Sequence, residues 1–412
     1  MKRFFSIFFI LFLPFILFCE DLTIAEYIES AKNDPRLKSK KAISDSIENS
    51  TDTPWIKGLE FRSETGNFDI LEQKYALRLY FKGFGETKYS REFIKNSENL
   101  YKLEYKSARS EVLFERYSAI VTYIQHKKEL EIIASMRKLL DDKLAVTEKI
   151  GEITAETTEI DKMDIEDKIT DLEMRKIELE STVESIEAAV RSDTGTDKKP
   201  VFDREKTVSI DEIERFAESL TEIHGATKAE IDYQAIKEIV AQNEIALEEA
   251  KERDWLKYVA LEYDTGDRRD KPSRGFSIGF AISIPGFKNN RSSLVKKKIK
   301  SLENNSDFES QSRLKETAIR TTLLMLKREI RQYKTLSERK REIERSGILQ
   351  KYSSIEGVNP IMVIKLQEKI LKKEMKLAEL ELGIYEKYIT LAYFLGIYED
   401  ESANNFLSGK IK

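Results

Sequence analysis

Side chains that could catalyse a reaction or hold a metal ion are scarce in this sequence of 412 residues. The chain has two histidines, His126 and His224, and a single cysteine, Cys19. These ligands are too few for a zinc or haem centre, and they argue against catalysis by a cysteine–histidine pair. A single cysteine also rules out a disulfide within one chain. We therefore expect no metal site and no cofactor.

Acidic side chains are numerous, but their spacing is not that of an active site. Carboxylates one helical turn apart in highly charged segments are typical of solvated helix surface, and the sequence has no glycine-rich phosphate loop of the Walker type. With 70 Lys and Arg against 74 Asp and Glu, the net charge is −4, which argues against general binding of nucleic acid. The sequence therefore predicts a protein that is not an enzyme.

The composition points instead to long helices. Gly and Pro number 16 and 7, about half of their usual combined share of roughly 12%, and both residues are unfavourable inside helices. Charged residues make up 35% of the chain and apolar residues 40%, which leaves a thin core for this length. These values disfavour a compact enzyme.

Residues 1–19 have the pattern of an export signal. Lys2 and Arg3 precede the apolar run 4–18, whose roughly 15 residues are too few for a membrane-spanning helix of about 20. Cys19 has two interpretations. It is either the lipidated cysteine of a lipoprotein, for which the bulky Phe18 is a poor neighbour, or the small residue before an ordinary signal-peptidase cut. Both interpretations predict export from a bacterial cytoplasm.

Short motifs recur in the same order about 200 residues apart. The pairs are Trp55-Ile56-Lys57 with Trp255-Leu256-Lys257, Thr65-Gly66-Asn67 with Thr265-Gly266-Asp267, Gly83-Phe84 with Gly286-Phe287, and Gly195 with Gly396. A nearly constant offset across four pairs indicates an internal duplication. We therefore expect a first repeat at 20–195, a linker at 196–225, a second repeat at 226–397 and a C-terminal tail at 398–412.

Each repeat is predicted to run helix, strand, strand, very long helix, turn and long helix. In the first repeat we expect helices at about 23–50, 86–150 and 155–193, and strands at 55–64 and 73–82. In the second we expect helices at 226–253, 288–355 and 360–396, and strands at 255–264 and 274–284, with a short helix near 210–222 in the linker. Proline placement supports these limits, because none occurs from 55 to 199, where it would break a helix.

The long helices repeat their apolar residues in steps of three and four, or of seven where a position such as Lys176 is polar. The runs are Ile165, Ile169, Leu172, Leu179, Val183, Ile186 and Val190, then Ile319, Leu323, Leu326, Ile330 and Tyr333, and finally Val363, Leu366, Ile370, Leu377, Leu380, Ile384 and Leu391. A period near 3.5 predicts helices that pack along a seam, as in a coiled coil. A cytosolic coiled-coil rod would show the same period, but the export signal and the strands count against it.

The predicted strands alternate apolar with small or polar residues, which gives each strand one apolar face. The predicted lipid-facing residues are Phe276, Ile278, Phe280, Ile282, Tyr75, Leu77 and Leu79. Segments of about ten residues with this pattern are typical of transmembrane β-barrels; two ordinary hairpins on a soluble core are the alternative. Trp55 and Trp255 open equivalent strands, which favours an aromatic girdle at a membrane interface.

Four strands cannot close a barrel, and open strand edges are not tolerated in lipid. The chain is therefore expected to supply its strands to a shared barrel, and three copies would give twelve, an even number in the known range. A 65-residue helix is about 98 Å long, far more than a membrane thickness. The expected fold class is α+β, mainly α. Long coiled-coil-like helices in two tandem repeats, each with a β-hairpin, would form a trimeric α-barrel and a 12-stranded transmembrane β-barrel.

Several motifs resemble those of the TolC-like outer membrane efflux proteins, over roughly residues 23–397. They are Asn33-Asp34-Pro35-Arg36-Leu37, Ser283-Ile284-Pro285-Gly286-Phe287 and Tyr393-Phe394-Leu395-Gly396. The resemblance implies a homotrimer in the outer membrane of a diderm bacterium, with a helical tunnel in the periplasm. It also implies a periplasmic adaptor (membrane fusion protein) and an inner-membrane pump of the RND or ABC type as partners, in efflux or type I secretion.

The resemblance further assigns two helix turns to adaptor docking. Their residues are Gly151, Thr154, Gly357, Val358, Asn359 and Pro360, where Gly and Pro are expected to break the helices. Some family members close the entrance with a ring of Asp just after the second turn, but residues 361–366 contain no acid. A constriction would then come from Glu156, Glu159, Asp161 or Asp164, which otherwise belong to a solvated helix face, or from an apolar iris that includes Ile361 or Met362.

Two other functions fit parts of the pattern. A periplasmic adaptor would have one helical hairpin flanked by β-rich domains, rather than two repeats with two alternating hairpins. An exported coiled-coil structural lipoprotein would have strands that never enter a membrane. The duplicated plan and the alternating strands favour the channel over both.

Overall fold

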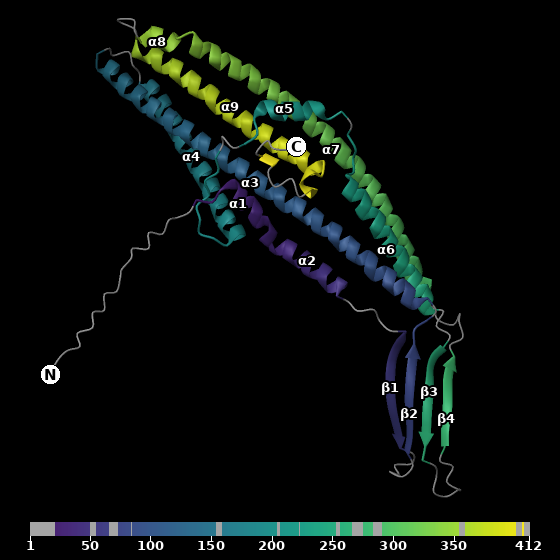
Figure 1. Ribbon diagram of the computed structural model, residues 1–412. Coiled ribbons are helices and arrows are strands. Elements are labelled where there is room, and N and C mark those ends of the chain that lie inside the picture. The colour runs from purple at the N-terminus through teal and green to yellow at the C-terminus, as the bar shows by residue number, and fades with distance from the viewer. Residues whose placement is uncertain are drawn as a thin grey trace, which may run out of the picture.

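A small antiparallel sheet stands at one end of the molecule, and long helices extend from it to the other end (Figure 1). The computed structural model describes residues 21–49, 55–65, 73–83, 85–153, 159–203, 207–221, 223–252, 256–265, 275–282, 291–353, 359–400 and 406–407. No helix within these ranges is both long enough and apolar enough to cross a membrane.

The sheet has four strands in sequence order. They are β1 (Ile56–Thr65), β2 (Gln73–Phe81), β3 (Leu256–Asp264) and β4 (Gly275–Ile282), each antiparallel to the next, and all lie within two residues of the predicted limits. A register shift occurs between Ile56 and Gly58 in the first hairpin and between Leu256 and Tyr258 in the second. Because these positions are 200 residues apart, the two hairpins share the same irregularity at the same place.

The helices follow the predicted order with two added breaks. The prediction of one helix over 23–50 is wrong, because Asp34, which precedes Pro35, leaves the helical conformation and a new helix begins at Pro35. The second break lies at Gly347.

Before the first hairpin lie α1 (Ile24–Glu29), the 3-10 turn η1 (Ser30–Asn33) and α2 (Pro35–Glu48), and after it come α3 (Glu86–Ile153) and α4 (Glu159–Thr194). Next come α5 (Ile210–Ser219) and α6 (Lys228–Glu252), and after the second hairpin α7 (Arg291–Arg345), α8 (Ile348–Ser353), α9 (Pro360–Phe394) and the 3-10 turn η4 (Ile397–Glu399). The 68 residues of α3 span about 100 Å at 1.5 Å per residue.

The helices form one layer that continues the sheet. Next to the sheet the neighbours run α2, α3, α6, α7, the same order as the strands to which they connect. Toward the far end α4 replaces α2 and α9 replaces α6, so the order becomes α4, α3, α9, α7. Only α3 and α7 run along both halves (Figure 1). Among the described helices, the layer therefore has one free edge at α2 and α4 and the other at α7.

The predicted heptad seams are buried between these neighbours. Exposed fractions are 3% for Ile165, 4% for Val183, 0% for Ile319, 0% for Leu326 and 0% for Ile384. The contacts join α4 to α3, α3 to α9, and α9 to α7. Burial of one such side chain contributes roughly 1.5–3 kcal/mol. Extended seams thus take the place of the single core of a globular domain.

A larger apolar cluster lies at the middle of the layer, where α1, α3, α5, α7 and α9 meet. Tyr398, Phe406 and Leu407 belong to it and are at most 2% exposed. The carbonyl of Leu407 accepts a hydrogen bond from the amide of Val208. These three residues of the predicted C-terminal tail, 398–412, therefore contribute to the core. The hint in the sequence is the apolar pair Phe406-Leu407 within a polar stretch.

Arg116 is a buried charge that ties the first helices to the layer. It is 2% exposed, and its guanidinium donates hydrogen bonds to the Tyr27 carbonyl and the Ser30 hydroxyl. The Tyr27 ring centre lies 4.8 Å from this guanidinium, and the Tyr27 hydroxyl donates to Asp193 at 2.8 Å. One polar network therefore joins α1, α3 and α4, and the apolar periodicity of the sequence does not predict it.

Glycines in the left-handed conformation end α4 and α9. Gly195 has φ +65° and Gly396 has φ +72°, and the duplication pairs these two positions. Gly347, with φ +57°, separates α7 from α8. The prediction of one unbroken helix over 288–355 is therefore wrong, because Gly adopts this conformation without the Cβ clash that other residues meet.

Gly151 shows the opposite behaviour. It was predicted to break the first long helix, but α3 continues through it to Ile153. A single Gly costs a helix only about 1 kcal/mol relative to Ala, which the neighbouring residues of a 68-residue helix offset. The prediction of a break at Gly151 is wrong.

Gly396 and Gly195 form a matched pair for testing close packing at the helix ends. A Cβ on Gly396 would lie 2.8 Å from Thr227 Cγ2, whereas a Cβ on Gly195 would meet nothing within 4 Å. Substitution by Ala costs about 1–2 kcal/mol at each position from the left-handed backbone alone. We expect Gly396→Ala to lower the thermal unfolding temperature several degrees more than Gly195→Ala, as measured by circular dichroism. Equal temperatures for the two variants would contradict the close approach at Gly396.

Candidate functional site

The cross-strand register brings the predicted lipid-facing residues together on one face of the sheet. Leu77 pairs with Phe61 and with Leu261, and Leu261 pairs with Ile278. Directly paired residues of antiparallel strands share a face, so this row crosses all four strands. The adjacent rows hold Ser63, Tyr75, Tyr263 and Phe276 on one side, and Leu59, Leu79, Val259 and Phe280 on the other, with Ile282 at the end of β4.

This apolar face is exposed in the single chain. The exposed fractions of Phe276, Ile278 and Phe280 are 74%, 75% and 68%, and that of Phe61 is 66%. Ile282 and Leu77 are also exposed, while Tyr75 and Leu79 are half-buried between their neighbours. Large contiguous apolar patches on a soluble surface are rare and mark contact with another protein or a membrane.

The opposite face of the sheet carries charged and small side chains. Its rows are Glu60, Arg78, Ala260 and Gly279, then Arg62, Ala76, Glu262 and Ser277, then Glu64, Lys74, Asp264 and Gly275. Arg78 lies 3.9 Å from Glu60 and 5.0 Å from the centre of the Tyr258 ring, and Lys74 pairs with Asp264 at 3.1 Å. The sheet therefore has one face suited to hydrocarbon and one suited to water.

Aromatic side chains lie at both ends of the apolar face. At the end next to the helices, Trp55 is 65% exposed and stacks on Phe81 with ring centres 5.0 Å apart. At the far end, Tyr75 stacks on Phe61 and Tyr263 packs on Phe276. The strand from Trp55 to the level of Tyr75 spans about 27 Å at roughly 3.4 Å per residue, close to the apolar band of about 25 Å in known barrels. Trp255 lies outside the described residues.

Three of the residues that the sequence assigns to adaptor docking, Gly151, Asn359 and Pro360, lie at helix ends at the far end of the layer. Asn359 caps α9, because its side-chain oxygen accepts a hydrogen bond from the Ile361 amide at 2.9 Å, and Pro360 follows at the first helical position. Asn359 and Pro360 are both exposed, and Gly151 lies in the last turn of α3. The structure does not describe Thr154, Glu156, Gly357, Val358 and Cys19.

The candidate constriction residues do not meet within one chain. Glu159, Asp161 and Asp164 are exposed at the start of α4, and Met362 is 57% exposed at the start of α9. α4 and α9 lie on opposite sides of α3 (Figure 1), so α3 separates the acids from Met362. Within the described ranges, no group of three His, Cys, Asp or Glu could hold a metal ion. Burial lowers the pKa of the His126 side chain.

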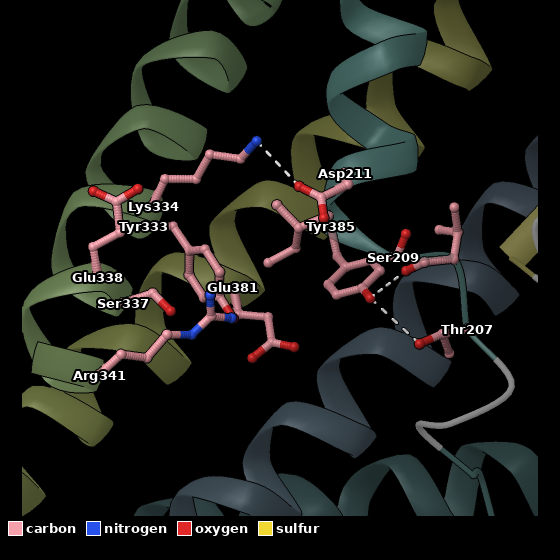
Figure 2. Close-up of a pocket in the computed structure, with 12 residues that line it drawn as sticks. Thr207, Ser209, Asp211, Tyr333, Lys334, Ser337, Glu338, Arg341, Glu381 and Tyr385 are labelled. Carbon is pink, nitrogen blue, oxygen red and sulfur yellow. Dashed lines mark hydrogen bonds and ion pairs between the residues drawn. The ribbon is translucent and has the colours of Figure 1, made fainter. Parts of the chain in front are cut away.

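A cavity of about 510 Å³ lies where α5 meets α7 and α9 (Figure 2). The Tyr385 hydroxyl donates to the Val208 carbonyl at 2.6 Å, and Lys334 pairs with Asp211 at 3.1 Å. Both polar contacts link different segments of the chain. The cavity therefore lies in the region where α5 is held against α7 and α9. A second cavity, of about 840 Å³, lies between α2, α3, α6 and α7.

Four ion pairs connect the long helices, three with a buried carboxylate and one, that of Glu329, with a carboxylate whose side chain is 12% exposed. They are Arg175–Glu129 between α4 and α3 at 3.1 Å, Lys143–Glu368 between α3 and α9 at 3.0 Å, Lys128–Glu381 between the same two helices, and Lys387–Glu329 between α9 and α7 at 3.0 Å. Loss of one partner leaves an uncompensated buried charge, which is strongly destabilising. The pairs therefore fix how far each helix can slide along its neighbour. Sequence periodicity identified the seams but not these pairs.

Solved structures with the same fold are outer-membrane channels. The open state of the Neisseria gonorrhoeae MtrE outer membrane channel aligns with a TM-score of 0.64 and 12% identity, over 90% of this chain and 88% of its own. CusC, whose structures concern folding and transmembrane channel formation, aligns with a TM-score of 0.63 and 11% identity, over 91% and 92%. The Campylobacter jejuni CmeC outer membrane channel aligns with a TM-score of 0.56 and 14% identity, over 94% and 89%.

These similarities confirm the resemblance to TolC-like proteins for the fold of the single chain, which is mainly helical with a small antiparallel sheet. No protein-family model matches the chain, and no curated protein matches its sequence. At identities of 11–14%, the alignments establish the shared fold and leave the activity to be argued from the residues.

Glu368 provides a pH-dependent test of the buried ion pairs. Burial alone would raise its pKa, but hydrogen bonds from Lys372 and Lys143 outweigh burial and lower the pKa to about 2. Because the pKa in the folded state lies below its ordinary value of 4.5, the pair stabilises the fold fully above that pH, and the stabilisation is lost as the pH falls toward 2.

We expect Glu368→Gln to reduce the free energy of unfolding by about 2 kcal/mol at pH 7, and the difference from the unsubstituted protein to shrink at pH 3. Denaturant unfolding at both pH values measures this. Glu316→Gln is the matched control, since Glu316 and Arg320 form an exposed pair worth about 0.5 kcal/mol or less. A difference for Glu368→Gln that does not change with pH would contradict the assignment.

Proposed function

We propose that the protein is an outer-membrane channel that conducts substrates out of the cell through a tunnel of long helices. The observation that carries this proposal is the sheet, which has one exposed apolar face and one charged face. This division is typical of a transmembrane β-barrel wall, with hydrocarbon outside and water inside. The fold shared with solved outer-membrane channels supports the proposal.

The unpaired edges of the sheet require further copies of the chain in this proposal. Within the described strands, β1 and β4 each pair with one neighbour only. In lipid an unpaired edge would leave backbone N–H and C=O groups without partners, at several kcal/mol for each group. Three copies supply four strands each. Pairing of β4 in one copy with β1 in the next gives a closed barrel of 12 strands. The proposed state is therefore a homotrimer in which the helical layers form a tunnel in the periplasm.

In this proposal the two repeats contribute equivalent structural elements to the channel. Residues 20–195 and 226–397 each supply one hairpin, one very long helix and one returning helix, with 196–225 as the link between them. Residues 1–19 direct export, after which Cys19 is either removed or lipidated. Trp55 and Trp255 form the aromatic girdle at the periplasmic side of the membrane.

The turn end of the tunnel is assigned to the partners. Since α3 alone spans about 100 Å, the end of α3 and the starts of α4 and α9 would lie far from the membrane that holds the sheet. We assign these helix ends to contact with a periplasmic adaptor, which links the channel to an inner-membrane pump of the RND or ABC type. The pump supplies the free energy, in efflux or in type I secretion, and the channel residues form and break no covalent bonds.

The entrance constriction is proposed to form between copies rather than within one. Each copy contributes exposed acids from the start of α4, namely Glu159, Asp161 and Asp164, and the exposed Met362 from α9. A ring of three copies repeats each of these side chains around the axis. Charge repulsion between the acids or contact between the Met side chains would then set the width of the entrance.

The exposed sheet also weighs against the two alternatives. A periplasmic adaptor or a structural lipoprotein would bury the apolar face of its hairpins against its own core. Here Phe276, Ile278 and Phe280 are about as exposed as Trp55 at the edge of the sheet. Burial of this face needs a surrounding that the chain itself does not supply.

Fractionation and electrical recording test the proposed function. We expect the protein to resist extraction by carbonate or high salt and to produce discrete conductance steps in planar bilayers. A tunnel that rests closed would be silent, so an Asn359→Ala/Pro360→Gly variant, which loosens the start of α9, serves as the matched sample. Easy extraction by salt, or silence of both the unsubstituted protein and the loosened variant, would contradict the proposal.

Two neighbouring positions on β4 test which face meets lipid. Ile278→Arg places a charge on the apolar face, which costs about 2–4 kcal/mol at the middle of a membrane, and we expect it to reduce the amount of protein assembled in the outer membrane. Ser277→Arg places the same charge on the polar face and should have a milder effect. Immunoblots of outer-membrane fractions measure both, and the reverse order would refute the facing.

A further inference from the structure

The register shift in the first hairpin places a lysine on the apolar face of the sheet. Lys57 has no counterpart on β2, because Ile56 and Gly58 pair with consecutive residues of that strand. Alternation back from Leu59 puts Lys57 on the apolar face. Ile56 lies on the same face, since it pairs with Phe81. A bulge of this kind re-aims a side chain, and here it turns two consecutive residues to one side.

The second hairpin repeats this arrangement with another lysine. Leu256 and Tyr258 pair with consecutive residues of β4, which leaves Lys257 as the extra residue of β3. Alternation back from Val259 puts Lys257 on the apolar face. The two lysines are two strands apart in the sheet, a distance of about 10 Å. The duplication therefore repeats a lysine together with the bulge that directs it.

Lys57 and Lys257 are the only charged side chains on this face among the described strand residues. Both are exposed, and neither has an ion-pair partner within the described ranges. At the far end the same face ends in the uncharged Ser63, Thr65 and Gln73. The apolar face thus carries positive charge at the end next to the helices and no charge at the other end.

The surroundings of Lys57 suit the surface of a membrane. Trp55 is 65% exposed and precedes Lys57 by two residues, about 7 Å along an extended chain. Tryptophan favours the level of the lipid head groups, and a lysine stem can lie along apolar surface while its ammonium reaches that level. A charge on the lipid side of a barrel also costs least near the interface. Under the proposed function, Lys57 is therefore placed where lipid phosphates lie.

Phosphate is the group at a membrane surface that an unpaired ammonium fits best. A lysine ammonium is a compact charge with three N–H donors, and phosphate oxygens accept charge-assisted hydrogen bonds from it. A zwitterionic head group carries its own cation beside the phosphate, which competes with the lysine. An anionic head group has no such cation, so the two lysines favour lipids with net negative charge.

We propose that Lys57 and Lys257 bind the phosphate groups of anionic phospholipids in the membrane leaflet next to the helices. In a closed barrel of three copies the lysines recur on every second strand, because they lie on β1 and β3. Two lysines from each copy then form a ring of six that holds the barrel at one depth in the membrane. The inference rests on the proposed function, since it takes the apolar face to lie in lipid.

The two tryptophans of the chain provide a reporter for this site. Trp55 and Trp255 are the only ones in the sequence, and each precedes one of the two lysines by two residues. Bromine atoms on a lipid chain quench the fluorescence of a tryptophan beside them. Full-length protein is reconstituted in phosphatidylcholine bilayers that contain either brominated phosphatidylglycerol or brominated phosphatidylcholine. The two quenching curves give the ratio of the binding constants of the anionic and the zwitterionic lipid.

We expect this ratio to be about five in the unsubstituted protein, the effect of one basic residue near a charged membrane surface. The ratio should fall to about one in Lys57→Gln/Lys257→Gln and should be kept in Lys57→Arg/Lys257→Arg, which retains the charge. Higher salt should lower the ratio in the unsubstituted protein, because ions screen exposed charges.

Lys296→Gln/Lys298→Gln on α7 is the matched control. These lysines are exposed and have no ion-pair partner among the described residues, and their substitution changes the net charge by the same amount. They lie about 8–11 Å along α7 from its start, on the side away from the sheet (Figure 1). Physiological salt screens exposed charges beyond roughly 8 Å, so we expect the ratio to be unchanged. Loss of the preference in this control, with the strand variant unaffected, would assign the lipid to α7 and overturn the inference.

Two further outcomes would overturn the lipid inference and leave the proposed function standing. One is a ratio of one in the unsubstituted protein while both lipids quench, which would show that the lysines reach only water. The other is a preference that inorganic phosphate abolishes and chloride at equal ionic strength does not, which would assign the lysines to a free anion. Absence of quenching by either lipid would instead contradict the proposed function, since the tryptophans would then lie outside the membrane.

Discussion

Backbone groups at the edge of a β-sheet need hydrogen-bond partners, and hydrocarbon supplies none. This constraint governs the whole molecule under the proposed function. A four-stranded sheet with an exposed apolar face is unstable alone in water and has unpaired edges in lipid, so its stability depends on further copies. The helices continue the strand order from β1–β4 into α2, α3, α6 and α7, and they therefore inherit the same two free edges. One chain is therefore one sector of a tube, and its two free edges are surfaces that other copies would cover.

The internal duplication builds such a sector from one structural unit used twice. Equivalent register shifts at Ile56 and Leu256, and left-handed glycines at Gly195 and Gly396, show that the two halves repeat local detail. The halves differ where they meet the rest of the chain: α9 lies between α3 and α7, whereas α4 lies at an edge. That difference covers α9 on two sides by long helices and leaves α4 with a long helix on one side only, among the described residues. Similar sequences in different places thus acquire different partners.

The strands and heptad seams could be predicted because their signals are local. The face that holds Ile278 and Leu77 could be predicted because large apolar residues alternate with small or polar residues along each strand. Contacts between distant segments had no such signal, which is why the burial of Phe406, the Arg116 network and the Lys143–Glu368 pair were missed. Gly347 and Gly151 show a further limit, since one ends a helix and the other does not, and the cost of a single Gly is too small to decide between the two. The docking and entrance residues depend on other molecules, so they remain predictions.

In the proposed channel, the apolar face of the sheet meets lipid while the opposite face meets water. Spin labels placed one at a time along β4, from Gly275 to Ile282, test it in reconstituted membranes through collision with oxygen, which concentrates in lipid, and with a water-soluble nickel complex. We expect strict alternation, with oxygen favoured at Phe276, Ile278 and Phe280 and nickel favoured at Ser277, Gly279 and Ala281. High nickel accessibility at both sets of positions would contradict a membrane-spanning strand and with it the channel.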